Sequence, residues 1–99
     1  MRGPAVPPRV LHLDARDNVA VAVADLEIDE VVDVEEMVVT VRDAIPFGHK
    51  MALTSIDEGA SIVKYGEVVG IATCVISSGD HVHVHNVASS RLPGEPAHS

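Results

Sequence analysis

The sequence contains almost no aromatic residues. Phe47 and Tyr65 are its only two aromatic rings, and tryptophan is absent. Proteins that bind single-stranded nucleic acid stack the bases on aromatic side chains, so this class of binding is not expected here. The hydrophobic share is nevertheless 46%, which is ordinary for a globular protein. The core therefore has to be built from Val, Ile, Leu and Ala.

Basic residues are also scarce. Seven Lys and Arg stand against 15 Asp and Glu, which gives a formal net charge of −8. Phosphate backbones and anionic lipid surfaces attract proteins with an excess of basic residues, so neither nucleic acid nor a membrane is expected as a partner. Residues 25–43 alone contribute −7, because this segment holds eight acids and one base, Arg42. We expect the segment to form a solvated face or a docking surface for a basic partner.

Disulfides and long apolar runs are lacking as well. Cys74 is the single cysteine, and a small domain without a disulfide favours a reducing compartment. The N-terminal residues have no apolar run of the kind a signal peptide needs, and the longest apolar stretch, 68–76, is far shorter than the roughly 20 residues that span a bilayer. We therefore expect a cytoplasmic protein. Residues 73–75 are interpreted as a buried strand segment in which the thiol is unreactive.

The length of 99 residues corresponds to one small domain. Valine alternates with other residues along most of the chain, which is the period of strands with one buried face. We expect a mainly β fold of short strands and hairpins over residues 10–88, with a disordered lead-in at 1–9 and a flexible tail at 89–99. At most a short helical turn is expected within 25–36. The expected strands cover residues 10–13, 18–24, 31–34, 37–41, 49–53, 61–65, 68–73 and 81–87.

A short motif recurs along the chain. It consists of an apolar residue, two spacers, a Gly or Asp, and a second apolar residue six positions after the first. This pattern predicts a strand end, a tight turn with a residue that tolerates positive φ, and a return strand. The alternative is a set of unrelated hairpins with similar turn chemistry. The motif begins at Leu26, Ile45, Ile56 and Ile76.

Histidines and valines alternate from His81 to His85, and Asn86 follows. If 81–87 is one strand, the three imidazoles line one face at intervals of about 6.6 Å, while Val82 and Val84 enter the core. His81, His83 and His85 are therefore a candidate metal site. The same row can instead contact a substrate or supply a proton near neutral pH. A polar, solvent-facing strand edge is the remaining alternative.

Two further segments place basic groups beside a turn glycine. They are Gly48-His49-Lys50 and Lys64-Tyr65-Gly66. Backbone amides together with a cation can approach an anion in such a turn. The alternative is an exposed strand end that happens to follow a glycine.

Four blocks of the sequence together resemble a known family. They are residues 17–22, 45–53, 64–70 and 79–87, and in this order they are similar to the SAF domain of altronate and galactarate dehydratases and to the small subunit of sulfolactate sulfo-lyase. The resemblance implies a β-clip fold, a small folded-over β structure. Family members often have His or Asn three residues before the Asp17-Asn18 pair, and here Asp14 stands there. The positions that match the family's motifs are Gly48, His49, Lys50, Lys64, Tyr65, Gly66, His83, His85 and Asn86.

This resemblance implies the small subunit of a two-component hydro-lyase of the sugar-acid dehydratase type. A larger catalytic subunit is then expected as partner, with a divalent metal, iron or manganese, held mainly by that partner. Removing hydroxide from a hydroxy acid needs a base, an acid or metal, and stabilisation of an enediolate. The chain has no dense set of carboxylate and cysteine ligands that would complete such a metal site alone. We therefore expect it to be inactive by itself and assign no catalytic residue. The expected substrate-binding residues are His49, Lys50, Lys64, Tyr65, His83, His85 and Asn86.

Other functions remain open at this stage. The chain can equally be the small subunit of a carbon–sulfur lyase that releases sulfite. It can also be a stand-alone, non-catalytic module that binds a carbohydrate or a partner, or a small metal carrier. Self-association into a homo-oligomer is expected where an apolar patch is exposed.

Overall fold

The computed structural model describes residues 8–89, and these residues form nine β-strands and no helix. The mainly β fold class is therefore confirmed, and residues 25–36, where at most a short helical turn is expected, form none. The lead-in and the tail fall outside the described residues except for positions 8, 9 and 89. The strands are β1 (Val10–Leu11), β2 (Val19–Ala22), β3 (Val31–Val34), β4 (Met37–Thr40), β5 (Lys50–Ala52), β6 (Ser61–Lys64), β7 (Glu67–Ala72), β8 (His81–Val82) and β9 (Val87–Ala88).

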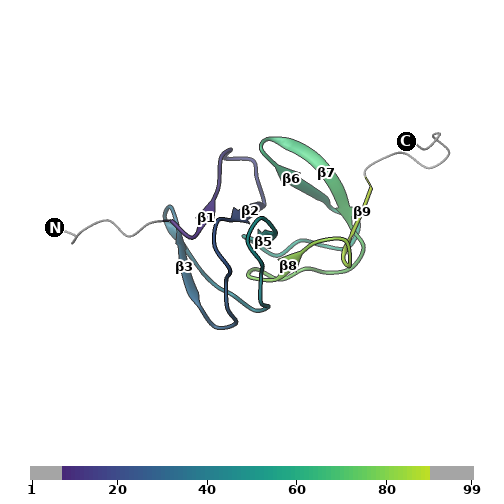
Figure 1. Cartoon of the computed structure of the whole chain (residues 1–99). Helices are drawn as coiled ribbons and strands as arrows, with labels where there is room; N and C mark the ends of the chain where they lie inside the picture. The colour runs from purple at the N-terminus through teal and green to yellow at the C-terminus, as the bar shows by residue number, and fades with distance from the viewer. Residues whose placement is uncertain (1–7, 90–99) are drawn as a thin grey trace.

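These strands form three small antiparallel sheets. A four-stranded sheet has the order β1-β2-β5-β8, β3 pairs with β4, and a three-stranded sheet has the order β6-β7-β9. In Figure 1 the central four-stranded sheet separates the hairpin that contains β3 from the hairpin of β6 and β7. Between positions 8 and 89, no helix has the length and apolar character needed to cross a membrane.

The recurring motif forms the same tight turn at each of its four positions. The fourth residue of each copy has a φ between 73° and 90°. The next residue donates its N–H to the carbonyl three positions back at 3.0 Å in every copy. Positive φ at the third turn residue together with this bond defines a type II turn. The structure thus confirms the predicted turn-and-strand motif, and the residues with positive φ are Asp29, Gly48, Gly59 and Gly79.

The turns are paired two by two. Leu26 and Ile45 exchange backbone hydrogen bonds of 2.8 and 2.9 Å, and Ile56 and Ile76 exchange two bonds of 2.8 Å. Each pair is buried in its own cluster of apolar side chains. The fold therefore consists of two similar halves, each built around one pair of turns.

The two halves repeat one another along the sequence. Leu26 and Ile45 correspond to Ile56 and Ile76, which follow them by thirty and thirty-one residues. The extra residue of the second half is Val69, which has no partner between the paired positions of β6 and β7. In sequence, the two halves share only their turn chemistry and their pattern of buried residues. The duplication is therefore hardly visible in the residue types.

Valine, isoleucine, leucine and alanine make up the core, as predicted from the composition, and Met51 joins them at 0% exposure. The burial predicted for residues 73–75 is wrong. Cys74 and both its neighbours are exposed, because β7 ends at Ala72 and the chain bends before it reaches the turn that begins at Ile76. The apolar run of the sequence continues through a bend that belongs to no strand.

Candidate functional site

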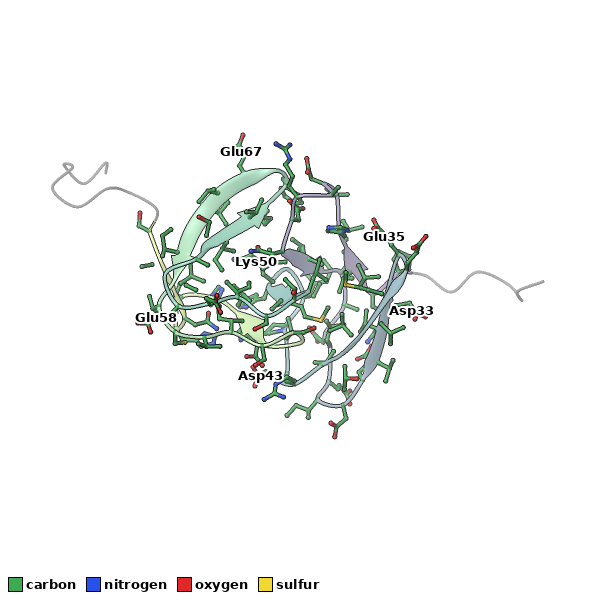
Figure 2. The ribbon with its side chains drawn as sticks, turned by 180° about the vertical axis from the view of Figure 1, so that it is seen from behind. Asp33, Glu35, Asp43, Lys50, Glu58 and Glu67 are labelled. Carbon is green, nitrogen blue, oxygen red and sulfur yellow. The ribbon has the colours of Figure 1, made fainter. Side chains whose placement is uncertain are left out.

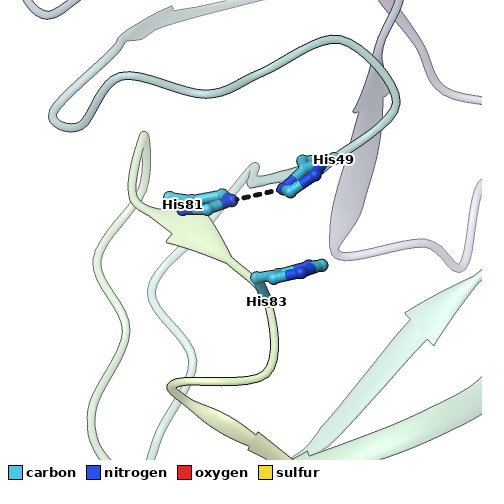
Figure 3. Close-up of side chains that lie close together, drawn as sticks. All are labelled: His49, His81 and His83. Carbon is cyan, nitrogen blue, oxygen red and sulfur yellow. Dashed lines mark hydrogen bonds between the residues drawn. The ribbon is translucent and has the colours of Figure 1, made fainter.

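Three histidines meet at one end of the central sheet. His49 directly precedes β5, His81 begins β8, and His83 directly follows β8. Strands β5 and β8 are antiparallel neighbours, with Met51 opposite His81, so the start of one strand faces the end of the other. The Nδ1 atom of His49 lies 2.9 Å from the Nε2 atom of His81, and His83 lies beside both rings (Figure 3).

The three half-buried rings are stacked. The ring centroids of His49 and His83 are 4.1 Å apart, those of His49 and His81 are 5.1 Å apart, and those of His81 and His83 are 5.5 Å apart. One nitrogen from each ring lies within 4.8 Å of the other two. The metal site predicted from the sequence named His85 instead of His49. His85 is exposed, and its ring lies 5.1 Å from that of His81 in a tilted arrangement.

The single strand expected over residues 81–87 is not formed, and this prediction is wrong. Strand β8 ends at Val82, a turn follows, and β9 begins at Val87 in a different sheet. Val84 is consequently 81% exposed and does not enter the core. Residues 83–86 turn because the N–H of Asn86 donates to the carbonyl of His83 at 3.1 Å.

Asn86 holds the histidine turn from inside. Its buried side chain accepts a hydrogen bond from the N–H of His83 and donates one to the carbonyl of His81, both at 2.9 Å. Both polar atoms of the amide are therefore engaged with the backbone of the two histidines. The structure makes Asn86 a positioning residue for the backbone of the histidines, a role that the sequence did not predict. The substrate contact expected of Asn86 stays a prediction.

Lys50 follows His49 in the chain and lies near His83, and Lys64 lies near Lys50. Lys50 belongs to β5 and is paired with Val82 of β8, and Lys64 is the last residue of β6. Burial, followed by the charge of Lys64, lowers the pKa of Lys50. We call His49, Lys50, Lys64, His81 and His83 the basic cluster.

The basic cluster also changes the titration of its histidines. Burial and the neighbouring His49 lower the pKa of His83, and Lys50 adds to this effect. Burial and His49 likewise lower the pKa of His81. Each of these shifts favours the neutral imidazole, whose free nitrogen can accept a hydrogen bond or bind a metal ion.

The two lysines differ from the arginines in their partners. Within residues 8–89 neither Lys50 nor Lys64 forms an ion pair, and the Lys64 ammonium lies 5.0 Å from the ring centre of the half-exposed Tyr65. Every arginine in this range is bound to a carboxylate. These pairs are Arg9–Glu30, Arg16–Asp14 and Arg42–Asp80, at 2.7, 2.8 and 2.9 Å.

Negative charge gathers on another part of the molecule. The acidic segment forms the β3–β4 hairpin and its flanking turns, where most of its carboxylates are exposed. Figure 2 shows Asp33 and Glu35 on the outside of this hairpin and Lys50 near the middle of the view. The arrangement agrees with a solvated acidic face, and among residues 8–89 no carboxylate pairs with a side chain of the basic cluster.

Asp17 and Asn18 fix the hairpin that carries Lys64 and Tyr65. The Asn18 side chain accepts from the N–H of Val63 at 2.8 Å and donates to the carbonyl of Ser61 at 2.9 Å. The buried Asp17 accepts from the N–H at position 66 at 2.8 Å. Sequence reasoning recorded this Asp-Asn pair as part of a motif without a role, and the structure makes it an anchor between β2 and β6.

Asp14 has a local structural partner. Its carboxylate accepts hydrogen bonds from the side chain and the backbone N–H of Arg16, and these bonds hold the pKa of Asp14 well below its usual range. The carboxylate and guanidinium lie where a Cβ on Gly66 would be placed. This ion pair therefore lies against the tip of the same hairpin.

An open hollow of about 460 Å³ lies elsewhere on the surface. Its walls include Asp29, Arg42, Asp43 and Asp80. The one cation among them, Arg42, is already bound to Asp80 at 2.9 Å. The hollow contains no residue of the basic cluster and offers little attraction to an anion.

Comparison with known proteins identifies relatives of this chain. Residues 8–90 match the altronate/galactarate dehydratase SAF domain. The chain is 45% identical over 80 residues to altronate dehydratase of Escherichia coli K12, covering 81% of this chain and 16% of that enzyme. It is 45% identical over 51 residues to (2R)-sulfolactate sulfo-lyase subunit alpha of Chromohalobacter salexigens, covering 52% of this chain and 54% of that subunit.

A second sulfo-lyase subunit alpha, from Paracoccus pantotrophus, is 38% identical over 52 residues, which cover 52% of this chain and 78% of that subunit. The chain thus spans a small part of the dehydratases and between half and four fifths of the two sulfo-lyase subunits. The resemblance stated from the four sequence blocks is confirmed over the whole described domain. The chain belongs to the altronate/galactarate dehydratase SAF-domain family.

Proposed function

We propose that this chain is the SAF component of a carbon–oxygen lyase that removes water from a hydroxylated acid together with a larger catalytic component. The observation that carries the proposal is the basic cluster. In a chain with a net charge of −8, its two lysines are the described Lys or Arg residues without a carboxylate partner. Lys64 lies near Lys50, and Lys50 lies near His83.

An anionic ligand accounts for this arrangement. A partly buried ammonium group is costly unless an opposite charge accompanies it, and the lowered pKa of Lys50 reflects that cost. A substrate carboxylate would supply the missing negative charge between Lys50 and Lys64. The neighbouring imidazoles can then donate to or accept from the hydroxyl groups of the same molecule.

The chemistry of elimination defines what this component contributes. The cluster can bind and orient the acid, and the neutral imidazoles of His81 and His83 can accept hydrogen bonds from its hydroxyl groups. The base that removes the α-proton and the groups that stabilise the enediolate belong to the larger component in this proposal. Tyr65 and His85 lie at the border of the cluster, where they can contact a bound sugar acid.

A metal expected for such an enzyme fits the cluster only in part. Imidazole nitrogens suit iron, whereas manganese favours oxygen ligands, and the three-histidine group contains no carboxylate. His49, His81 and His83 are thus the residues of this chain that would hold an iron ion. Such an ion would act as a Lewis acid on the leaving hydroxyl. A manganese ion would have to be held by the larger component.

The test is the purified complex of this chain with its larger component, supplied with altronate, galactarate and sulfolactate. We expect one of the sugar acids to lose water. We also expect the Lys50→Met/Lys64→Met double variant to lower kcat/KM for that acid at least tenfold, with most of the loss in KM. Arg42→Met is the matched control, because it removes a cation outside the basic cluster that is already paired. Equal kcat/KM for the double variant and the wild type would reject the substrate-binding role.

A carbon–sulfur lyase is the second candidate, and the similarity to the two sulfo-lyase subunits favours it. The same assay separates the two, because release of sulfite from sulfolactate replaces loss of water. A stand-alone binding module would behave differently again. The isolated chain would then bind the acid tightly, and no larger component would be needed for a stable complex.

A further inference from the structure

The rings of the three histidines in the basic cluster lack an acidic partner in the described part of the chain. Among residues 8–89, the imidazoles of His49, His81 and His83 form no hydrogen bond or ion pair with a carboxylate, and the one bond between their rings joins His49 to His81. His12 shows the contrast, because its Nδ1 atom lies 3.2 Å from Glu35. Asp43 comes near the cluster, but it accepts from the backbone N–H of His81 and not from its ring.

The spacing of the ring nitrogens suits one small cation. Ligand atoms about 2.1 Å from a tetrahedral ion are about 3.4 Å from one another. The His49–His81 nitrogens are 2.9 Å apart, and all three nitrogens lie within 4.8 Å of one another. Shifts on the order of 1 Å, with a tilt of the stacked rings, would give the tetrahedral spacing.

The backbone that carries the histidines is well defined. His81 and His83 are joined to the buried amide of Asn86, and His49 follows Gly48, whose N–H donates to the carbonyl of Ala22 at 2.8 Å. A site held on paired strands and a bonded turn keeps its ligands close together before an ion arrives. This preorganisation lowers the entropic cost of binding.

We propose that His49, His81 and His83 together bind one divalent transition-metal ion of the zinc or iron class through three imidazole nitrogens. Nitrogen ligands select such ions over magnesium or calcium, which need oxygen ligands. Three protein ligands leave at least one coordination position open. The proposal concerns the isolated chain and does not depend on which reaction the assembled enzyme performs.

The test is a titration of the full chain, purified without a histidine tag, with Zn²⁺ by calorimetry and with Co²⁺ by visible absorption. We expect one ion per chain and, for Co²⁺, the absorption bands of a tetrahedral complex. His49→Gln, His81→Gln and His83→Gln should each lower the affinity at least tenfold. His85→Gln is the matched control and should bind as the wild type does, because His85 lies outside the three-nitrogen group.

A second readout guards against variants that do not fold. Zn²⁺ should raise the Tm of the wild type and of His85→Gln, because an ion that binds only the folded state stabilises it, and it should leave the Tm of His81→Gln unchanged. If Zn²⁺ and Co²⁺ do not bind the wild type stoichiometrically, the proposal is wrong. It is also wrong if His85→Gln loses binding as fully as His49→Gln does, because the site would then be the row of histidines 81, 83 and 85.

These outcomes are independent of the lyase assignment. A chain that binds zinc through the three histidines but has no role in elimination would support the metal site and reject the proposed function. A complex that is active and sensitive to the lysine substitutions, while its SAF component binds no metal ion, would support the proposed function and reject the metal site.

Discussion

The backbone N–H of Ile56 donates to the carbonyl of Ile76, and the N–H of Ile76 donates back to the carbonyl of Ile56, both at 2.8 Å. Both side chains are buried, at 3% and 0% exposure. The pair joins the turn before β6 to the turn before β8. It therefore sets the position of the hairpin that carries Lys64 relative to the strand that carries His81.

Replacing Ile76 by alanine should destabilise the protein strongly. Removing the buried side chain from a core that cannot collapse around the gap costs about 2–5 kcal/mol. Val75→Ala is the control, because Val75 is 63% exposed and exposed substitutions usually change stability by about 0.5 kcal/mol or less. Urea denaturation of both variants measures the difference. Equal free energies of unfolding would mean that Ile76 does not stabilise the core of the second half.

Most of the fold could be predicted from the sequence because its elements are local. The recurring turn needs a residue that tolerates positive φ at a fixed distance from two buried apolar residues, and Gly59 and Gly79 satisfy this requirement within a few positions. Alternating valines then place the strands on either side. The pairing of Ile56 with Ile76 is different, because it joins segments twenty residues apart and no local pattern specifies it.

The parts of the site that were predicted wrongly depend on long-range contacts. Alternation favoured one strand from 81 to 87, but the side chain of Asn86 turns the chain back, and β9 pairs with β7 in another sheet. The role of His49 in the three-histidine group follows from the pairing of β5 with β8. Alternation in the sequence shows neither that a side-chain contact ends a strand nor which strands are neighbours.

Two glycines with similar φ should respond differently to alanine. Gly48 and Gly79 have φ of 86° and 90°, and this conformation alone costs a residue with a Cβ about 1–2 kcal/mol. A Cβ at Gly48 meets open space, whereas one at Gly79 overlaps the backbone carbonyl of Thr40. Gly79→Ala should therefore lower the free energy of unfolding clearly more than Gly48→Ala. Similar losses in chemical denaturation would contradict the close approach of Thr40.

Stability should fall in acid partly through Glu30. Its carboxylate accepts from the side chain of Arg9 at 2.7 Å and from the N–H of Glu27 at 3.0 Å, and these bonds lower its pKa from the usual 4.5. A lowered folded-state pKa stabilises the fold above the unfolded value, and this contribution is lost as the pH falls through the folded value.

Glu30→Gln should therefore have a lower Tm than the wild type at pH 7, and the difference should shrink as the pH is lowered through the carboxyl range. Glu58→Gln is the control, because Glu58 is exposed and forms no ion pair among residues 8–89. Thermal melts at a series of pH values measure both variants. A Tm difference for Glu30→Gln that is constant with pH would show that the ion pair does not contribute.

The role of Asn86 as a positioning residue can be separated from its effect on stability. Asn86→Ala leaves the N–H of His83 and the carbonyl of His81 without their side-chain partner, which costs about 1–3 kcal/mol. Asn18 makes two comparable bonds to the backbone at positions 61 and 63, so Asn18→Ala should cost a similar free energy of unfolding. If Asn86 holds the histidines in place, only Asn86→Ala should also lower the affinity for Zn²⁺, by several-fold.

Asn86→Asp refines this comparison, because it keeps the acceptor for the His83 N–H and removes the donor to the His81 carbonyl. Its affinity for Zn²⁺, measured by calorimetry at a temperature where every variant is folded, should lie between those of the wild type and Asn86→Ala. An equal loss of affinity in Asn18→Ala and Asn86→Ala would mean that general destabilisation weakens the site. The histidine turn would then owe its geometry to strand pairing, and the amide of Asn86 would serve stability alone.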